Sequence, residues 1–259
     1  MPEPAILDPL ILDPVVAYDQ IGPVFARIAE QRRSYLDSID HLVISQIPRG
    51  SRSMLDVGAG DGGRARRIAQ ARDIADLVLV EPSVAMHGNT LGNQASDAKL
   101  RTMRAEELHL IDGKFDVVIC LWNVLGHIFP AANRLEVLRQ FARLVSPQGG
   151  IFVDVHHRYN VRHYGAIPTA FRFLHDRLKW KDTSGDIVIA WDVEDVRCIT
   201  RGHVFTDREF RTLAQEAALN IENRFVVDYA TGERRQWSIE GHLLYVLRRT
   251  APRSVQHTS

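Results

Sequence analysis

Residues 53–63 read Ser-Met-Leu-Asp-Val-Gly-Ala-Gly-Asp-Gly-Gly, and this stretch decides the fold of the chain. Its first five residues form a short apolar run that is typical of a buried strand, and residues 58–63 form a glycine-rich turn. The Ala- and Arg-rich segment that follows, up to about Arg72, predicts a helix. A buried strand, a glycine turn and a helix in this order are typical of the βαβ units of open parallel sheets.

The alternation of strands and helices continues on the C-terminal side of the turn. Strand-like runs occur at residues 77–80, 99–103, 115–121 and 151–155, and helical patterns lie between them. Two further β-rich stretches follow at residues 224–229 and 242–248. Runs that are mostly apolar indicate strands covered on both faces. We therefore expect an α/β, doubly wound, mostly parallel, seven-stranded sheet of the Rossmann-like kind.

Length and composition exclude several classes of protein. The chain has 259 residues, 45% of them hydrophobic, with 32 Lys and Arg against 32 Asp and Glu. This balance is that of an ordinary globular protein, and zero net charge argues against a nucleic-acid partner. Two cysteines, Cys120 and Cys198, form neither a disulfide framework nor a zinc motif, so no metal is expected.

The chain also lacks the patterns that direct proteins into or across membranes. Its first residues do not follow the basic-then-apolar order of a secretory signal, and no apolar run approaches the ~18 residues of a membrane span. The sequence therefore predicts a cytoplasmic protein without a membrane partner.

Carboxylates around the glycine turn indicate the kind of ligand. The turn satisfies the G-x-G-x-x-G pattern through Gly58, Gly60 and Gly63. Glu81 ends the next strand, where a carboxylate can bind both hydroxyls of a ribose. A dinucleotide would bring a pyrophosphate to the turn, but Asp56 precedes the turn and Asp61 lies inside it. Two anions suit a ligand with an ammonium and a sulfonium, as in S-adenosylmethionine. A dinucleotide oxidoreductase is the alternative.

Residues 55–62, Leu-Asp-Val-Gly-Ala-Gly-Asp-Gly, resemble the signature of class I S-adenosylmethionine-dependent methyltransferases. The resemblance covers roughly residues 50–155 and, more loosely, residues 206–248. It implies S-adenosylmethionine as the cofactor and methyl transfer as the activity. The cofactor-binding residues that it implies are Asp56, Gly58, Gly60, Asp61, Glu81, Pro82, Met86, Ala105, Glu106 and Leu121.

The resemblance assigns these residues to different parts of the cofactor. Asp56 and the glycines would line the methionine end, Glu81 would bind the ribose, and residues 82–86 would lie along the adenine. The family usually has Asp-Ala-Glu after the third strand, where the aspartate contacts the adenine amino group. This chain has Arg104-Ala105-Glu106 instead, so Glu106 or the backbone around Ala105 would supply that contact.

The resemblance places the reacting methyl group at the end of the fourth strand. Transfer of a methyl group requires alignment, a dry site and, for some acceptors, a base. We expect His127 and His156 as bases or orienting groups, because histidine titrates near neutral pH. The expected substrate-binding residues are Tyr18, Trp122, Asn123 and His157. The chain has eleven histidines, so chance proximity to the site is the competing interpretation for them. For Tyr18 it is core packing.

The expected acceptor is a small molecule, methylated at O, N or C. The fourth strand does not end in Asn-Pro-Pro-Tyr, which is typical of methyltransferases acting on base or glutamine amino groups. The arginines of the first sheet helix favour a solvated helix face over a nucleic-acid surface; they are Arg64, Arg66, Arg67 and Arg72. Two alternatives remain: methylation of RNA or protein, and a non-catalytic nucleoside-binding module of the same fold.

A single domain over residues 1–259 is the simplest division of the chain. Thr206, with Glu209 three positions later, forms a capping box that begins the last helix. The expected parts are an N-terminal arm with lid helices (1–50), a cofactor-binding core (51–155), an aromatic insert over the substrate site (156–203), and the last helix with antiparallel strands (204–250).

Overall fold

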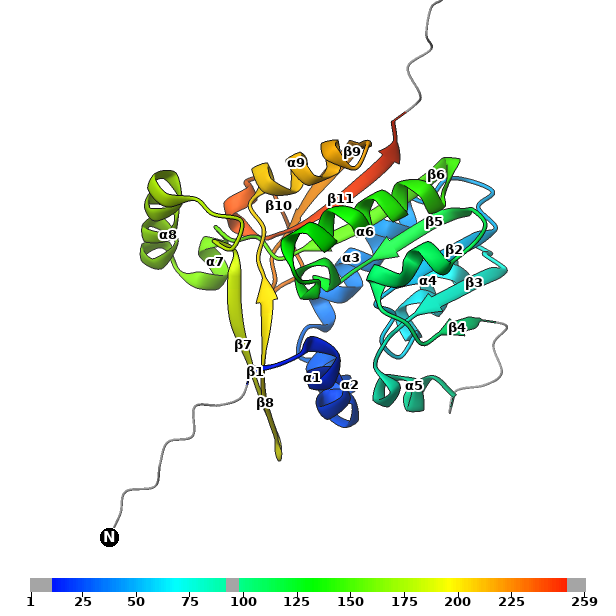
Figure 1. Cartoon of the computed structure of the whole chain (residues 1–259), viewed down its shortest axis with the longest axis horizontal. Coiled ribbons are helices and arrows are strands. Elements are labelled where there is room, and N and C mark those ends of the chain that lie inside the picture. Colours follow the sequence, from blue (N-terminus) through cyan, green and yellow to red (C-terminus); the bar gives the residue numbers. More distant parts are fainter. Residues whose placement is uncertain (1–10, 92–97, 251–259) are drawn as a thin grey trace, which may run out of the picture.

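A sheet of eight strands forms the centre of the computed structural model, which describes residues 11–91 and 98–250 (Figure 1). The strands follow the order β10-β9-β11-β6-β5-β2-β3-β4. Their bounds are β2 (Ser53–Val57), β3 (Asp76–Val80), β4 (Lys99–Arg101), β5 (Phe115–Cys120), β6 (Val145–Val155), β9 (Leu219–Val227), β10 (Arg234–Arg235) and β11 (His242–Arg249). This arrangement confirms the expected fold class, with the short β10 added to the seven predicted strands.

The two halves of this sheet differ in strand direction. Strands β4, β3, β2, β5 and β6 pair in parallel, whereas β11 and β9 pair antiparallel beside β6. Strand β6 begins at Val145, six residues before the run predicted for it, because the segment with Gly149 and Gly150 continues the ladder with β5. The carboxyl ends of β2, β3 and β5 therefore meet at one edge of the sheet, where open α/β sheets bind ligands.

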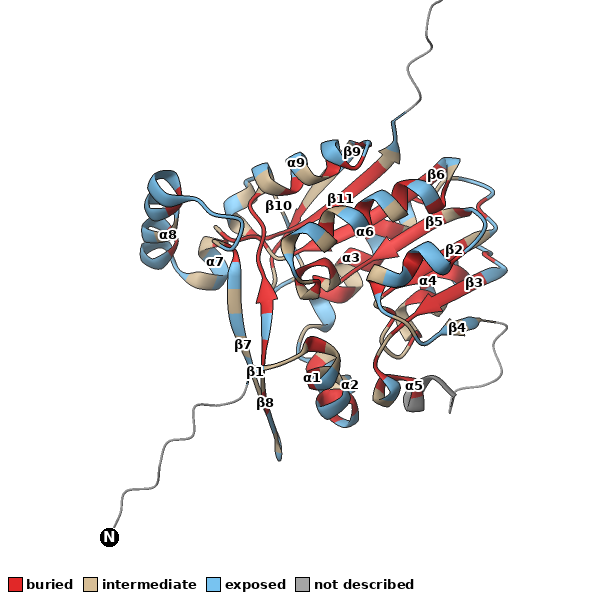
Figure 2. Ribbon diagram, in the orientation of Figure 1, coloured by how far each residue is buried: buried red, intermediate tan, exposed pale blue. Residues whose placement is uncertain are grey.

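Helices cover both faces of the sheet, so that β2 supplies side chains to two cores (Figures 1 and 2). Leu55 and Val57 pack on the face covered by α6 (Ala131–Leu144) and α9 (Asp207–Glu216). Met54 packs on the other face, against α3 (Arg33–Gln46) and α4 (Gly63–Ala71). Residues 54–57 are all buried, because successive side chains of a strand point to opposite faces and helices cover both faces here.

A second, three-stranded sheet stands beside the first. Its order is β1-β8-β7, formed by β1 (Ile11–Leu12), β7 (Asp186–Val193) and β8 (Val196–His203). Helix α1 (Pro14–Ile21), the turn η1 (Gly22–Val24) and α2 (Phe25–Glu30) pack on this sheet. Their shared apolar cluster contains Ala17, Ile21, Val24, Ile28 and Cys198. The N-terminal helices are thus joined to the segment expected as an insert.

The rest of the insert is helical, with α7 (Val161–Tyr164) and α8 (Ala166–Lys179). The remaining short elements are α5 (Val84–Leu91), η2 (Ala105–Leu110), η3 (Val124–His127) and η4 (Ser238–Glu240). The capping box is confirmed, since Thr206 accepts from the Glu209 amide and Glu209 accepts from the Thr206 amide. No helix in the described ranges is both long and apolar enough to span a bilayer. The expected division into parts, the cover over a substrate site and the cytoplasmic location stay predictions.

Candidate active site

A cavity of about 310 Å³ lies at the carboxyl ends of β2, β3 and β5, with α1 and α2 along its other side. Most of the residues singled out in the sequence line it: Tyr18, Asp56, Gly58, Gly60, Asp61, Glu81, Pro82, Met86, Ala105, Glu106, Leu121, Trp122 and His127. Asn123, His156 and His157 are outside its lining. The fold thus brings residues from five separate parts of the sequence to one place.

The glycine turn passes close to neighbouring side chains on its way from β2 to α4. Gly58 has a φ of 77°, and a Cβ atom there would lie 2.4 Å from Cγ2 of Val124. The amides of Gly58 and Ala59 donate to the carbonyl of Val80, over 2.8 and 3.1 Å, and tie the turn to β3. Glycine is required at position 58 because both the left-handed backbone and the contact exclude a side chain.

Glu81 is held in place by the turn and by its own loop. Its Oε2 accepts from the amide of Gly60 over 2.8 Å, and its Oε1 accepts from the amide of Ser83 over 2.9 Å. Burial raises the pKa of this carboxyl, and the two backbone hydrogen bonds oppose the rise. Each oxygen keeps a further lone pair, so the fixed carboxylate can accept from two neighbouring hydroxyls of a ligand.

Asp56 is buried at the base of the cavity without a hydrogen-bond donor among the described residues. Burial raises the pKa of Asp56 to about 7; Arg64 opposes the rise, and Glu81 adds to it. Arg64 itself is paired with Asp40, with 2.6 Å between Nη2 and Oδ1. A buried carboxylate without its own counterion is unstable unless a cation comes to it. The residues of this cavity therefore fit a ligand with positive charge near Asp56 and hydroxyls near Glu81, as in S-adenosylmethionine.

Arg104, at the position where the family usually has an aspartate, forms an ion pair with the residue that caps α1. Its Nη2 donates to Oδ1 of Asp13 over 2.7 Å. Asp13 is also the N-cap of α1, since the same oxygen accepts from the amide of Val15. The arginine therefore connects the loop after β4 to the first turn of the helix along the cavity.

Two aromatic contacts join the N-terminal helices to the end of β5. The hydroxyl of Tyr18 lies 3.2 Å from Nε2 of His127, and the two rings meet edge to face. The rings of Phe25 and Trp122 lie 5.5 Å apart. Burial lowers the pKa of His127 to about 4, so its imidazole is neutral at physiological pH.

The turn after β5 is strained and firmly held. Trp122 and Asn123 have φ values of 61° and 60°, which side chains rarely adopt. The carboxylate of Asp154 accepts from the amide of Trp122 over 3.0 Å, and the Asp154 carbonyl accepts from the amide of Asn123. The Asn123 side chain donates to the carbonyl of His203 and accepts from the amide of His156. Asn123 therefore holds the turn in shape from behind the cavity.

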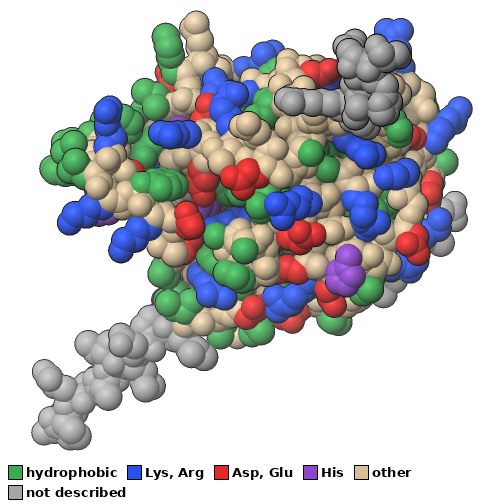
Figure 3. All heavy atoms as spheres, turned by 45° about the horizontal axis from the view of Figure 1, so that its top comes forward, with side chains coloured by type: hydrophobic (Ala, Val, Ile, Leu, Met, Phe, Trp, Pro, Cys, Tyr) green, Lys and Arg blue, Asp and Glu red, His purple; other side chains and the backbone are tan. Residues whose placement is uncertain are grey.

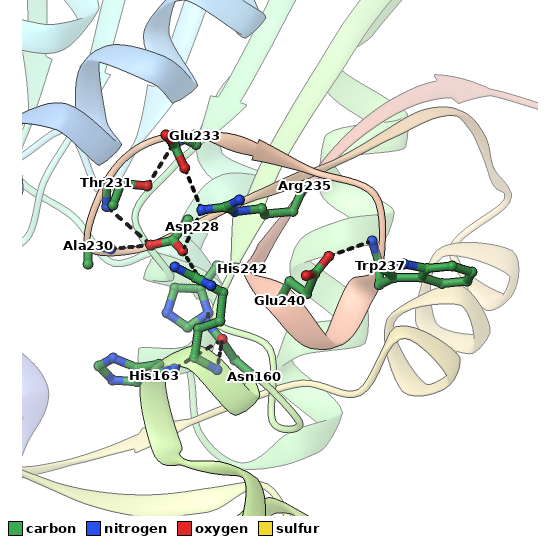
Figure 4. A network of polar contacts seen from close by, with 11 residues as sticks. Asn160, His163, Asp228, Ala230, Thr231, Glu233, Arg235, Trp237, Glu240 and His242 are labelled. Carbon is green, nitrogen blue, oxygen red and sulfur yellow. Dashed lines mark hydrogen bonds and ion pairs between the residues drawn. The ribbon is translucent and has the colours of Figure 1, made fainter.

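His156 and His157 belong to a buried group of rings behind the cavity. The ring of His156 stacks on that of His242 at 4.1 Å, and the His157 amide donates to Nδ1 of His242. Burial lowers the pKa of His156 to about 3 and that of His157 to about 4. Figure 4 shows how Asn160 contacts His242 next to the ion pairs of Asp228. The geometry places these histidines in packing, away from the cavity lining.

Some residues in the cavity lining or directly behind it could not be singled out from the sequence. Phe25 faces Trp122, and Asp154 holds the turn, but neither has a motif of its own. Arg64 was expected on a solvated face; it is instead largely buried, and with Arg67 it binds Asp40 of α3. The error has a physical cause, because α3 covers this face of α4 and provides a carboxylate for it.

Comparison with known proteins agrees with this geometry. Residues 55–152 match the family described as Methyltransferase domain. A glycine/sarcosine N-methyltransferase from Parasynechococcus marenigrum is 32% identical over 115 residues. That match covers 43% of this chain and 40% of the relative, so the chain spans well under half of its length.

Solved structures resemble a larger share of the chain. A S-adenosylmethionine-dependent methyltransferase from Clostridium acetobutylicum superposes with a TM-score of 0.62 at 12% identity, covering 88% of this chain and 99% of the other. A sugar N-methyltransferase from Streptoalloteichus sp. gives a TM-score of 0.59 at 16% identity, covering 88% and 92%. These likenesses show the shared fold. Residues 55–152 therefore match a methyltransferase domain, and the solved structures show that the fold of S-adenosylmethionine-dependent methyltransferases extends over most of the chain.

Proposed function

We propose that this protein transfers a methyl group from S-adenosylmethionine to a nitrogen atom of a small amine. The carboxylates of Asp56 and Glu81 and the glycine turn support the cofactor. The position of α1 and α2 along the cavity supports a small acceptor, because Tyr18 and Phe25 line a cavity of only about 310 Å³. The named activities of a glycine/sarcosine and a sugar N-methyltransferase are consistent with an amine.

When bound, S-adenosylmethionine supplies a methyl group on a positively charged sulfur. Asp56, which lines the cavity, would provide the negative charge that holds this cationic end. Glu81 would accept hydrogen bonds from the ribose hydroxyls, and the amides of Gly60 and Ser83 already fix its two oxygens for this. Trp122 and Phe25 exclude water from the end of β5, and alignment in a dry site is the main requirement of an in-line displacement.

The environment of His127 is the observation that favours nitrogen over oxygen. A hydroxyl acceptor must lose its proton as it reacts, and an efficient base needs a pKa near the working pH. His127 lines the cavity, but burial lowers its pKa to about 4, which makes it a weak base. A neutral amine already has a free lone pair. His127 and Tyr18 then act as hydrogen-bonding groups that orient the amine, and no strong base is required.

A paired acceptor screen tests this proposal. The protein is incubated with S-adenosylmethionine and with small amines, including glycine, sarcosine and an amino sugar, each beside its hydroxyl analogue and beside total RNA. Mass spectrometry then detects any added methyl group. We expect methylation among the amines, at a rate that rises with pH as the amine loses its proton. Methylation of a hydroxyl analogue or of RNA, with the amines unchanged, would contradict the proposal.

A further inference from the structure

Helix α8 presents a row of apolar side chains to solvent, whereas its two buried residues are polar. Ile167, Phe171, Leu174 and Leu178, which we call the α8 stripe, are between 57% and 75% exposed. Successive members are four, three and four residues apart in the sequence, which is the spacing of a continuous stripe along one face of a helix. Surface helices normally show the reverse arrangement, with this kind of stripe against the core.

The opposite face of α8 is anchored by polar contacts. Thr169 and Asp176 are the buried residues of this helix. The Asp176 carboxylate accepts from Nε and Nη2 of Arg158, over 2.5 and 3.0 Å, and from the hydroxyl of Tyr159 over 2.8 Å. These contacts fix the rotation of the helix, so the α8 stripe cannot turn inward without breaking a buried ion pair.

The α8 stripe also lies at the edge of the molecule. Helix α8 is the element farthest to the left in Figure 1, and hydrophobic side chains gather at the same edge in Figure 3, with Lys and Arg side chains around them. A contiguous exposed apolar surface of this kind marks an interaction site. Its place at the edge lets a second large body approach without colliding with the sheet.

We propose that the α8 stripe is the contact surface for a second copy of this chain, with the two helices antiparallel. The intervals along the stripe are four, three and four residues, and this order is the same from either end. A two-fold axis between Phe171 and Leu174 therefore places every apolar side chain of one copy opposite an apolar side chain of the other. Ile167 then faces Leu178 of the second copy at each end, and Phe171 faces Leu174 in the middle. On one side of the stripe, Arg177 comes beside Ala170 of the second copy. On that side the contact therefore places no two like charges opposite each other.

The size of the surface agrees with a dimer of modest affinity. Burying four such side chains on each of two copies removes roughly 1,000 Å² of surface, which is near the lower limit for a specific interface. A contact of this size without interchain ion pairs is expected to have a dissociation constant in the micromolar range.

Charge placement at the two ends of the α8 stripe tests the antiparallel contact. Ile167 and Leu178 are about 16 Å apart along one helix, too far for an ion pair within one chain. We expect the wild-type protein to dimerise with concentration in sedimentation equilibrium. Ile167→Glu and Leu178→Lys alone should be monomeric at concentrations where the wild type is dimeric. An equimolar mixture of the two variants should dimerise again, because each Glu meets a Lys across the contact.

The matched control is Val188→Lys on β7, since Val188 is a 60% exposed apolar residue outside the α8 stripe. This variant should dimerise like the wild type, and circular dichroism should show all variants folded. A wild type that stays monomeric overturns the proposal, and its co-sedimentation with phosphatidylglycerol vesicles would then assign the stripe to a membrane surface. Dimers that survive both single substitutions, or single variants that do not recover on mixing, overturn the antiparallel contact.

Discussion

The hydroxyl of Tyr18 lies 3.2 Å from Nε2 of His127, although the two residues are 109 positions apart in the sequence. One comes from the first helix and the other from the turn after β5, and both line the cavity. This contact joins the N-terminal helices to the place where the acceptor is proposed to bind. It makes the pair the first target for mutation.

Tyr18→Phe and His127→Gln should slow turnover more than they weaken cofactor binding. Loss of one hydrogen bond is worth about 0.5–1.5 kcal/mol, so we expect Tyr18→Phe to reduce kcat by roughly two- to tenfold. His127→Gln should cost at least as much, because the neutral imidazole is proposed to orient the amine. Steady-state kinetics with calorimetry of S-adenosylmethionine binding provides the measurement. If both variants lost cofactor affinity as much as kcat, the pair would belong to the cofactor site.

Cofactor affinity should depend on pH through Asp56. The pKa of this carboxyl is about 7 in the free protein, and a bound cation favours its ionised form. Protons therefore compete with the cofactor, and affinity should fall about tenfold from pH 8 to pH 6. Calorimetry at several pH values measures the slope. Asp56→Asn should bind weakly at every pH and show a flat profile; the same slope in this variant would assign the titration to another group.

Removal of the Asp154 carboxylate should lower activity more than removal of the Tyr35 hydroxyl, which donates to one of its oxygens. Asp154 accepts from the Trp122 amide and from the hydroxyl of Tyr35, at 3.0 and 2.6 Å. Asp154→Ala should destabilise the fold by about 1–3 kcal/mol and lower kcat, since the strained turn loses its acceptor.

Tyr35→Phe is the matched control for this prediction. It removes the other hydrogen bond and should cost about 1 kcal/mol of stability with kcat nearly unchanged. Urea denaturation and steady-state kinetics together separate the two effects. Equal loss of kcat in both variants would show that Asp154 acts only through general stability.

Buried histidines should make the protein sensitive to acid. Burial lowers the pKa of His156 to about 3 and that of His157 to about 4, below the usual value of 6.5. At pH values between the folded pKa and 6.5, these histidines bind protons in the unfolded chain but not in the folded one. The free energy of unfolding therefore falls as the pH drops below about 6.5. The raised pKa values of Asp56 and Asp154 act in the opposite direction and reduce the loss.

Urea denaturation at pH 7.5 and pH 5.5 measures this dependence. His156→Gln should show a smaller loss of stability between the two pH values than the wild type. His41→Gln, which changes an exposed histidine of α3, should keep the wild-type loss. An unchanged loss in His156→Gln would assign the acid sensitivity to other groups.

The parallel half of the sheet and the glycine turn were predictable from the sequence because their signals are local. The runs at β2, β3 and β5 are mostly apolar, and the capping box of Thr206 and Glu209 is complete within four residues. The second sheet was missed for the opposite reason. Strand β7 alternates between exposed and half-buried residues, and β1 has only two residues, so their pairing depends on a partner far away in the chain.

The candidate site divides in the same way. Residues with a motif, such as Asp56 and Glu81, were found because glycine turns and strand ends have a fixed relation to ligands. The Arg64–Asp40 ion pair and the role of Asp154 behind Trp122 require knowledge of which helix covers which face. No local pattern of the sequence contains that information.

The measurement that tests the account most directly is thermal unfolding with S-adenosylmethionine, S-adenosylhomocysteine and NAD in parallel. A ligand present at about 100 times its dissociation constant stabilises the folded state by about 2.7 kcal/mol. We expect both adenosyl ligands to raise Tm and NAD to leave it unchanged. Glu81→Gln should reduce the adenosyl shifts, and Glu136→Gln, on the exposed face of α6, should not. A shift with NAD alone would contradict the assignment of this cavity to S-adenosylmethionine.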